Sequence, residues 1–326
     1  MFPERRMRRL RRTPTLRRLV SETSVRVDDL VAPLFIREGI DAPQPIASLP
    51  GVVQHTLDSL VKEAHELSEL GVPALMLFGI PQSKDATGSQ AWAPDGIVQR
   101  ALQELKHSLD DRMILIADLC LDEYTDHGHC GLLTPEGTVN NDATLELYGR
   151  VAVAQALAGA DVVAPSGMMD GQVAVIRGAL DEEAFEDTAI LAYSAKFASA
   201  LYGPFRDAVD VTIVDGGDRK AYQQNPANRR EAMSEIELDV AEGADIVMVK
   251  PALSYLDVIA EARATVDVPV AAYQVSGEYA MIKAASERGW IDGAAVGLEQ
   301  LTSIKRAGAD IILTYLAREV ATTLNG

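Results

Sequence analysis

Short runs of aliphatic and β-branched residues alternate along the chain with longer stretches in which apolar residues recur at helical spacing. Nearly continuous apolar runs are typical of strands in a parallel sheet that is covered on both faces. Amphipathic stretches such as 57–71, 96–109 and 231–243 predict helices between these strands. From residue 31 onward the runs predict eight strands, at 31–36, 73–79, 113–119, 160–165, 188–194, 244–250, 268–275 and 309–315.

Glycines stand at several of the expected junctions, just after a helical pattern and just before a strand, where a helix C-cap belongs. These are Gly71, Gly159, Gly243 and Gly308, and the last three begin the same tripeptide, Gly-Ala-Asp. Eight strands alternating with helices fit a closed α/β barrel, the (β/α)8 or TIM barrel, better than an open doubly wound sheet. No G-x-G-x-x-G follows the first strand, which weakens the case for a dinucleotide-binding fold.

Composition is that of a protein with a packed core and no membrane segment. Of the 326 residues 48% are hydrophobic, and the mean hydropathy is +0.03. No apolar run approaches the roughly 18 residues that span a bilayer, and the start of the chain lacks a secretory pattern. Two cysteines are too few for a disulfide framework and fit a reducing compartment. We therefore expect a cytoplasmic protein with no membrane contact.

Charge is distributed unevenly between the start of the chain and the remainder. The net charge is −18, yet residues 1–20 hold eight arginines against Glu4, which leaves the rest near −25. An Arg-rich start can bind nucleic acid or anionic lipid, direct import into an organelle, or lie on the acidic surface of a partner subunit. The body offers no second basic patch and only 5% aromatic residues. We therefore expect no nucleic-acid partner, a subunit-contact arm at 1–28 and a barrel domain at 29–326.

Two lysines, Lys196 and Lys250, each stand at the end of an apolar run. Most lysines remain in water, because burial of an unpaired ammonium costs several kcal/mol or more. A lysine at the mouth of a buried strand can instead lose its proton and become an amine nucleophile that forms imines with carbonyl compounds. Either lysine alone could equally cap a strand against a nearby carboxylate. The presence of both favours the chemistry.

Other polar residues follow the expected strands in the same way. Reactive groups of (β/α)8 barrels collect at the C-terminal ends of the strands. Residues at these positions are Cys120, Asp122, Ser166, Asp170, Lys196, Lys250, Ser276 and Tyr315.

The segment 118–131 contains both cysteines, Cys120 and Cys130, with Asp122 between them. Thiolate and carboxylate ligands suit zinc, and three protein ligands leave a fourth position open, as in catalytic zinc sites. Two buried thiols that never meet a metal are the alternative. His127 and His129 are further candidates, although a tight His-Gly-His loop could simply hydrogen-bond the backbone.

With these residues in place, the chain closely resembles the porphobilinogen synthase family, also called 5-aminolevulinate dehydratase. The resemblance covers nearly the whole barrel. It implies a lyase that condenses two molecules of 5-aminolevulinate to porphobilinogen, with loss of two waters, early in tetrapyrrole and haem synthesis. Its motifs are HGHCG (127–131), NDATLE (141–146), PSGMMDG (165–171), YSAKFAS (193–199), YGPFRDA (202–208), DRKAYQ (218–223), MVKPA (248–252) and YQVSGEYAMIKAA (273–285).

The resemblance also implies a role for individual residues. Lys250 would form the imine with the second-binding, A-side substrate and Lys196 the imine with the first-binding, P-side substrate. We expect each ammonium, together with partial burial, to lower the pKa of the other. One substrate carboxylate would be held by Ser276 and Tyr315. The other would be held from a lid at about 200–225 by Arg206, Arg219 and Gln223. Asp118, Ser166 and Asp170 would be inner polar groups.

The metal site departs from the commonest family pattern. Zinc-dependent members carry three cysteines in this loop, whereas this chain has Cys120, Asp122 and Cys130, and members without the cysteines lean on magnesium. We expect zinc at these three residues, held less selectively because a hard carboxylate replaces a soft thiolate. By resemblance, Glu235 would bind an allosteric magnesium ion; the alternative is an ordinary exposed glutamate. The resemblance also implies that the arm contacts a neighbouring subunit in a homo-octamer.

Two other functions remain open at this point. Another class I Schiff-base aldolase-type barrel enzyme would need only one lysine and usually a glycine-rich phosphate loop after the seventh or eighth strand. The segment 274–280 offers one glycine there. A nucleic-acid or scaffold protein would work through the arginine arm instead.

Overall fold

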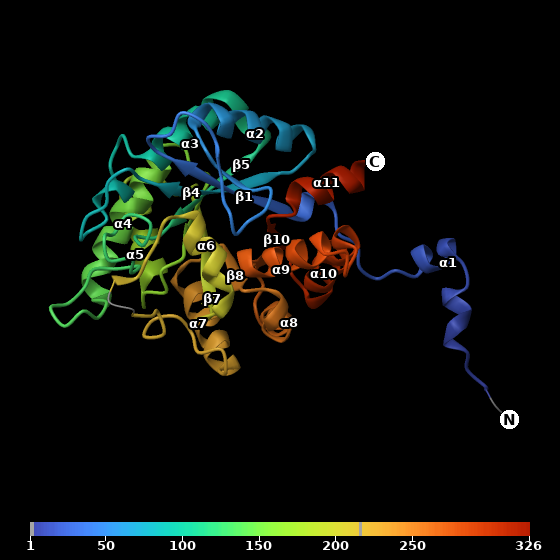
Figure 1. Ribbon diagram of the computed structural model, residues 1–326. Coiled ribbons are helices and arrows are strands. Elements are labelled where there is room, and N and C mark those ends of the chain that lie inside the picture. The colour runs from blue at the N-terminus through green and yellow to red at the C-terminus, as the bar shows by residue number, and fades with distance from the viewer. Residues whose placement is uncertain (1–2, 215–216) are drawn as a thin grey trace.

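A closed barrel of parallel strands forms the centre of the computed structural model, which describes residues 3–214 and 217–326 (Figure 1). Each strand pairs with the next, and β10 pairs with β1 through Ile312 and Leu30 to close the ring. The predicted (β/α)8 barrel is confirmed. Within the described residues its eight strands are β1 (Leu30–Arg37), β4 (Ala74–Ile80), β5 (Ile114–Leu119), β6 (Val162–Pro165), β7 (Ala189–Lys196), β8 (Ile246–Lys250), β9 (Val270–Gln274) and β10 (Ile311–Thr314).

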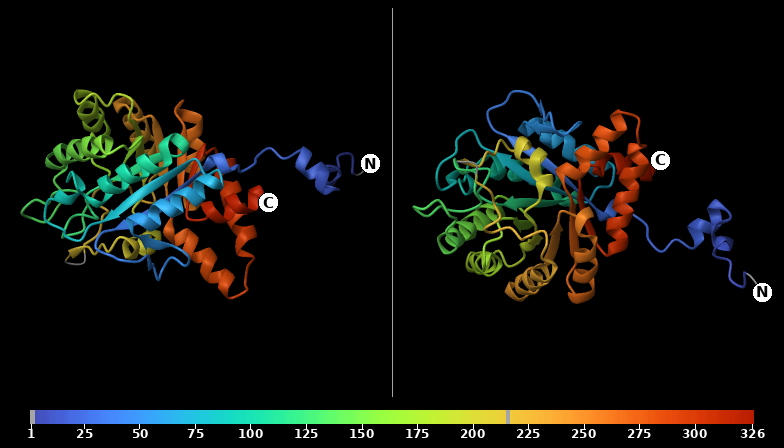
Figure 2. Two further views of the ribbon diagram at one scale, coloured as in Figure 1. Left: turned by 90° about the horizontal axis from the view of Figure 1, so that it is seen from above. Right: turned by 60° about the horizontal axis from the view of Figure 1, so that its bottom comes forward.

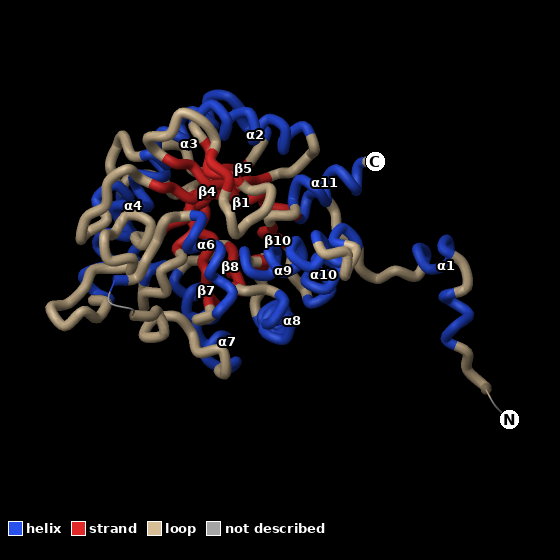
Figure 3. The backbone as a smooth tube through the Cα atoms, viewed as in Figure 1, coloured by secondary structure: helices blue, strands red, loops and turns tan. Residues whose placement is uncertain are grey.

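Helices surround the strands on the outside, as Figure 3 shows. Apolar side chains fill both the barrel interior and the layer between strands and helices, where Phe35, Leu60 and Leu102 are fully buried. The α-helices around the barrel are α2 (Leu57–Glu69), α3 (Ile97–Leu109), α4 (Asn141–Leu157), α5 (Gln172–Glu182), α6 (Gly203–Ala208), α7 (Arg229–Glu242), α8 (Leu256–Thr265), α9 (Ser276–Glu287), α10 (Gly293–Ala307) and α11 (Ala317–Asn325). Short 3-10 turns are η2 (Val27–Asp29), η3 (Ser89–Ala91), η4 (Asp110–Arg112), η5 (Ala200–Tyr202) and η7 (Leu253–Tyr255).

The recurring Gly-Ala-Asp tripeptide has one structural role at all three positions. Each glycine follows a helix with positive φ, +106° at Gly159, +110° at Gly243 and +122° at Gly308, which favours glycine. Each aspartate then makes two hydrogen bonds to one residue of the preceding strand. Its backbone N–H donates to the carbonyl of that residue, and its carboxylate accepts the backbone N–H of the same residue. The pairs are Asp161 with Leu115, Asp245 with Ile190 and Asp310 with Val270.

Strand β7 contains an extra residue relative to β8. Ala192 pairs with Val247, but Ala195 pairs with Val249, so three steps in β7 match two steps in β8. Such a bulge breaks the alternation of side chains along a strand. Beyond it Lys196 and Lys250 are register partners at the strand ends.

Two short strands lie outside the predicted pattern. β2 (Gln44–Pro45) pairs antiparallel with β3 (Val53–His55), and β3 adds to β1 beside Phe35 and Ile36. At two and three residues these strands are too short for a periodic signal.

The N-terminal segment lies apart from the barrel in all three views of the chain (Figures 1 and 2). It contains η1 (Met7–Arg11) and α1 (Pro14–Leu19), neither of which has a buried residue. Among its exposed side chains are the apolar residues Met7, Leu10, Leu19 and Val20. Nowhere in the described chain is a helix long and apolar enough to cross a membrane.

Candidate active site

The two lysines stand side by side at the barrel mouth. Register partners on neighbouring parallel strands lie about 5 Å apart and face the same side of the sheet. Lys196 is 5% exposed and Lys250 4% exposed, so both stems are buried. Both line one cavity of about 260 Å³, and residues of the expected lid line it too.

Aromatic rings surround the amine of Lys250. Its Nζ lies 4.6 Å from the ring centre of Tyr273, 4.9 Å from that of Tyr193 and 5.0 Å from that of Phe205. Ring faces attract an ammonium, whereas burial disfavours it. Burial, followed by the charge of Lys196, prevails and lowers the pKa of Lys250 to about 7. The expected shift is confirmed for this lysine, and a large fraction of it is amine near neutral pH.

Lys196 behaves differently. Burial alone would lower its pKa, but Cys130, Cys120, Asp122 and Asp118 together raise it. Its Nζ donates to the carbonyl of Ser166. The expectation that both lysines have lowered pKa values is therefore wrong for Lys196. These four acidic groups outweigh the effect of burial.

Asp118, on β5, is a buried carboxyl close to both lysines. Burial raises its pKa to about 6, while Lys196 and Lys250 act in the opposite direction. One oxygen, Oδ2, accepts the Ser166 hydroxyl at 3.1 Å. The other, Oδ1, is buried and has no hydrogen-bond partner within residues 3–214 and 217–326. A carboxyl with this pKa can take up and release a proton near neutral pH.

Residues of the expected lid line the same cavity. Arg206 is exposed at its edge, whereas Arg219 and Gln223 are mostly buried. Arg219 donates to the carbonyl of Gly128 at 2.8 Å and pairs with Asp122 at 2.7 Å. Its Nε and the Nε2 of Gln223 are buried donors for which the described chain provides no acceptor. Two unpaired donors in one cavity suit an anionic ligand.

Ser276 is buried and Tyr315 is half-buried. The Ser276 hydroxyl is 3.4 Å from the carbonyl of Leu201. Tyr315 has its hydroxyl 3.1 Å from that of Tyr273, whose ring faces Lys250. Tyr315 also lines a second cavity, of about 150 Å³. Neither residue lines the cavity of the two lysines, so the structure connects Tyr315 to Lys250 through the Tyr273 ring, and Ser276 to the lid through Leu201.

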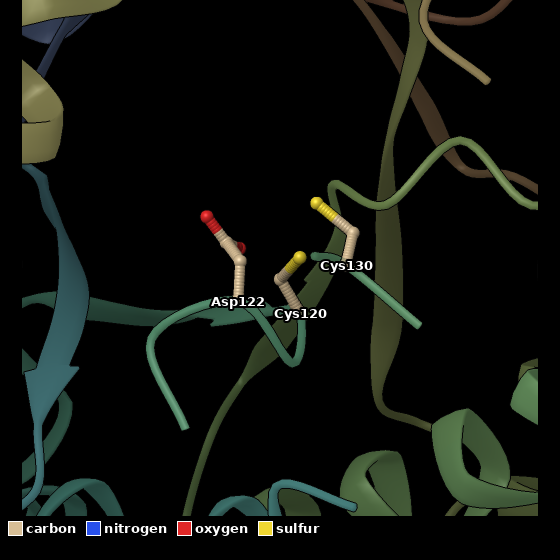
Figure 4. Close-up of side chains that lie close together, drawn as sticks. All are labelled: Cys120, Asp122 and Cys130. Atoms are coloured by element: carbon tan, nitrogen blue, oxygen red, sulfur yellow. The ribbon is translucent and has the colours of Figure 1, made fainter. Parts of the chain in front are cut away.

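Cys120, Asp122 and Cys130 form a group that can hold a metal ion. One ligand atom from each lies within 4.8 Å of the others, and all three residues are buried. Figure 4 shows the three side chains projecting into the same space. Burial alone would raise the pKa of Asp122, but Arg219 and Lys196 hold it well below its usual range. Both cysteines are free thiols, so the donor set fits a metal that accepts sulfur and oxygen.

The histidines of this loop have other partners. His127 accepts the backbone N–H of His129 at 3.1 Å through Nδ1, as a tight loop predicts. His129 Nδ1 lies 3.2 Å from the hydroxyl of Tyr222. His129 thus connects the metal loop to the lid.

Glu235 lies on α7, half-buried beside a cavity of about 340 Å³. Asp170 and Glu231 line the same cavity. Burial raises the pKa of Glu235, and Asp170 and Glu231 add to the effect. Lys220 and Gln223 line both this cavity and that of the two lysines, so one stretch of chain forms a wall of each.

Several residues near the lysines were not predicted. Tyr193, Phe205 and Tyr273 provide the rings, and only their position in the quoted motifs signalled them. Glu123, next to Asp122, is buried, and its Oε2 has no partner in the part of the chain that is described. Burial, followed by the charges of Asp122 and Asp118, raises its pKa well above the usual range. Nothing in the sequence separates it from an exposed glutamate.

Comparisons with known proteins give one family. The family model described as delta-aminolevulinic acid dehydratase matches residues 4–323. A protein of that name from Streptomyces coelicolor is 58% identical over 325 residues, which cover 99% of this chain and 98% of the relative. Its counterpart from Mycobacterium tuberculosis is 58% identical over 322 residues, covering 98% and 97%. Among solved structures, the chain is similar to delta-aminolevulinic acid dehydratase (porphobilinogen synthase) from Toxoplasma gondii, crystallised in complex with the reaction product porphobilinogen. The TM-score is 0.96 at 45% sequence identity, and the match covers 98% of this chain and 92% of that one.

Proposed function

The chain belongs to the delta-aminolevulinic acid dehydratase family, and from this we propose that it condenses two molecules of 5-aminolevulinate through imines on Lys250 and Lys196. The enzyme is a lyase, and its product is porphobilinogen, a precursor of tetrapyrroles such as haem. The observation that carries the assignment of the lysines is their register pairing at the ends of β7 and β8, above one cavity.

The chemistry begins with the amine of each lysine. It adds to the ketone carbon of one substrate, and water leaves as the imine forms. A protonated imine withdraws electrons, so that the adjacent carbon can lose a proton and attack the second substrate. Both lysines depart as the carbon–carbon and carbon–nitrogen bonds form, and the two waters are the net loss. Asp118, with a pKa of about 6, is suited to carry the proton.

Two separate sets of polar groups hold the two substrate carboxylates. Arg219 and Gln223 offer buried donors to one carboxylate, and Arg206 adds a positive charge at the edge of the cavity. Arginine suits this role because its planar fork matches a carboxylate. The hydroxyls of Ser276 and Tyr315 hold the carboxylate of the substrate on Lys250, and the Ser166 hydroxyl positions Asp118.

Zinc is the metal that we assign to Cys120, Asp122 and Cys130, since the two thiols favour it over magnesium. Bound there, it would act as a Lewis acid toward a substrate amine or carbonyl, and its charge would offset the acidic groups that raise the pKa of Lys196. Asp122 is shared between this ligand set and Arg219, so the metal loop and the lid are joined through one carboxylate.

A second cation, magnesium, is assigned to Glu235. Three carboxylates, those of Glu235, Asp170 and Glu231, line one cavity. Burial raises the pKa of Glu235, and repulsion from the other two carboxylates adds to the effect. Magnesium suits such a site because it keeps several of its waters and needs only one or two carboxylates.

The arm, residues 1–28, is assigned to the contact with a neighbouring subunit in a homo-octamer, and residues 29–326 to the catalytic domain. Four exposed apolar side chains on the arm, Met7, Leu10, Leu19 and Val20, support an interface. Its arginines complement the acidic body. Two free buried thiols fit a cytoplasmic location.

Reductive trapping tests the proposal directly. Sodium borohydride added with 5-aminolevulinate should attach substrate to Lys250 and Lys196, as mapped by peptide mass. Labelling at neither lysine would refute the proposal, and labelling at one alone would favour an aldolase-type enzyme.

Lys250→Met should abolish porphobilinogen formation with an unchanged circular dichroism spectrum. The matched control, Lys62→Met, changes an exposed lysine of α2 and should leave turnover intact.

A further inference from the structure

Glu278 is a buried carboxylate that connects two turns at the barrel mouth. It is the third residue of α9 and is 1% exposed. Its Oε1 accepts the backbone N–H of Leu253 at 2.8 Å, and its Oε2 accepts that of Val275 at 2.7 Å. Leu253 lies in the turn just after Lys250, and Val275 lies just before Ser276. One side chain therefore joins the turn that follows β8 to the turn that follows β9.

A helix cap explains only half of this arrangement. The bond to Val275 caps the start of α9, as an acidic residue in a first helical turn often does. The bond to Leu253 reaches a segment 25 residues away and adds nothing to that helix. Burial raises the pKa of Glu278 to about 7, against the backbone N–H groups that favour its charged form. A buried carboxyl at this position costs free energy that a neutral cap would avoid.

The position of the Lys250 amine depends on its backbone. Lys196 donates a hydrogen bond from Nζ to the Ser166 carbonyl, which fixes its amine directly. Lys250 Nζ instead lies among aromatic rings, whose attraction for an ammonium is less directional than a hydrogen bond. Its own carbonyl accepts the N–H of Phe197 at 2.9 Å and the hydroxyl of Tyr202 at 3.2 Å. Glu278 provides the next attachment along the chain, three residues after Lys250.

We propose that Glu278 is a positioning residue for the condensation, which holds the turn after Lys250 in fixed relation to Ser276. The inference rests on the proposed roles of Lys250 as the imine-forming amine and of Ser276 as a holder of the same substrate's carboxylate. The ketone carbon and the carboxylate of one substrate must reach these two groups at once. The two bonds of Glu278 fix the distance between the backbones that carry them.

The test compares imine formation at the two lysines of the same molecule. The probe is 4-oxopentanoate, which has the ketone and carboxylate of the substrate but no amine and cannot condense, with sodium cyanoborohydride and peptide mass mapping. Glu278→Gln keeps the shape, but its amide NH2 replaces one of the two oxygens and cannot accept the N–H that this oxygen held. We expect trapping at Lys250 to slow about tenfold, because displacements of about 1 Å can reduce rates a hundredfold. Trapping at Lys196 should stay within about twofold.

The ratio of the two rates separates positioning from loss of fold. Unfolded molecules trap at neither lysine, so a merely structural role lowers both rates together and leaves the ratio unchanged. The control is Asp310→Asn, which removes a carboxylate that accepts the N–H of Val270 at 3.0 Å at the opposite end of β9. It should leave the ratio unchanged. An equal loss at both lysines in Glu278→Gln, or no loss, overturns the inference. Failure of the unaltered enzyme to trap at either lysine would count against the proposed function itself.

Discussion

The lowered pKa of Lys250 leads to a quantitative prediction for the pH dependence of imine formation. Only the amine form attacks a ketone, because the proton of an ammonium occupies the lone pair. The structure lowers the pKa from 10.5 to about 7, with burial as the largest cause and Lys196 next. A change of this size corresponds to about 5 kcal/mol at about 1.4 kcal/mol per pH unit. At pH 7 about half of Lys250 is amine, whereas an unperturbed lysine would have about 3 parts in 10,000.

The assay is the initial rate of trapping at Lys250 with 4-oxopentanoate and cyanoborohydride, between pH 5.5 and 9.5. Below pH 7 the rate should fall about tenfold per unit, and above it the rate should level off. Lys196→Met removes the neighbouring ammonium that lowers the pKa, so the midpoint should move to higher pH. It should stay below 10.5, because burial remains. A rate that continues to rise tenfold per unit beyond pH 9, or a midpoint that moves down in the variant, would refute the reasoning.

Further predictions concern the metal loop, the second cation and the arm. Cys130→Ala should reduce bound zinc, measured by elemental analysis after gel filtration, well below one per chain; unchanged stoichiometry would place the metal elsewhere. Asp122→Cys supplies a third thiolate and removes the ion pair with the lid arginine. Zinc should then be lost more slowly to a chelator while trypsin cleaves the lid faster, and slower cleavage would contradict a lid held by Asp122. Glu235→Gln should remove any stimulation by magnesium without changing borohydride trapping; a retained response would place the cation elsewhere. Deletion of residues 1–20 should yield smaller assemblies in sedimentation equilibrium, and an unchanged mass would exclude the arm as the main contact.

Much of the barrel could be predicted from local pattern. Strands such as β5 and β8 are short apolar runs between helical stretches, and the Gly-Ala-Asp tripeptides mark three junctions. The aspartates of those tripeptides proved to bind the preceding strand, as at Asp245 and Ile190. The pair β2 and β3 could not be predicted, because strands of two and three residues carry no periodicity.

The sequence predicted which site residues stand at the ends of strands, but not which side chains surround them. In a regular strand Tyr193 and Lys196 would face opposite sides, since they are three positions apart. The bulge in β7 brings both toward the barrel interior, and sequence alternation gives no sign of it. The raised pKa of Lys196 depends on acidic groups from another segment, of which Cys130 contributes most. Glu278 likewise acts across 25 residues of chain.

Lys220 and Gln223 belong to the walls of both the lysine cavity and the Glu235 cavity. A ligand that immobilises this stretch from one side reduces the entropy that a ligand on the other side must still remove. Thermodynamic linkage then requires the effect to be mutual: if a cation at Glu235 tightens substrate binding by some factor, substrate tightens cation binding by the same factor. Titration of magnesium in the presence and absence of 4-oxopentanoate would measure that factor without any turnover.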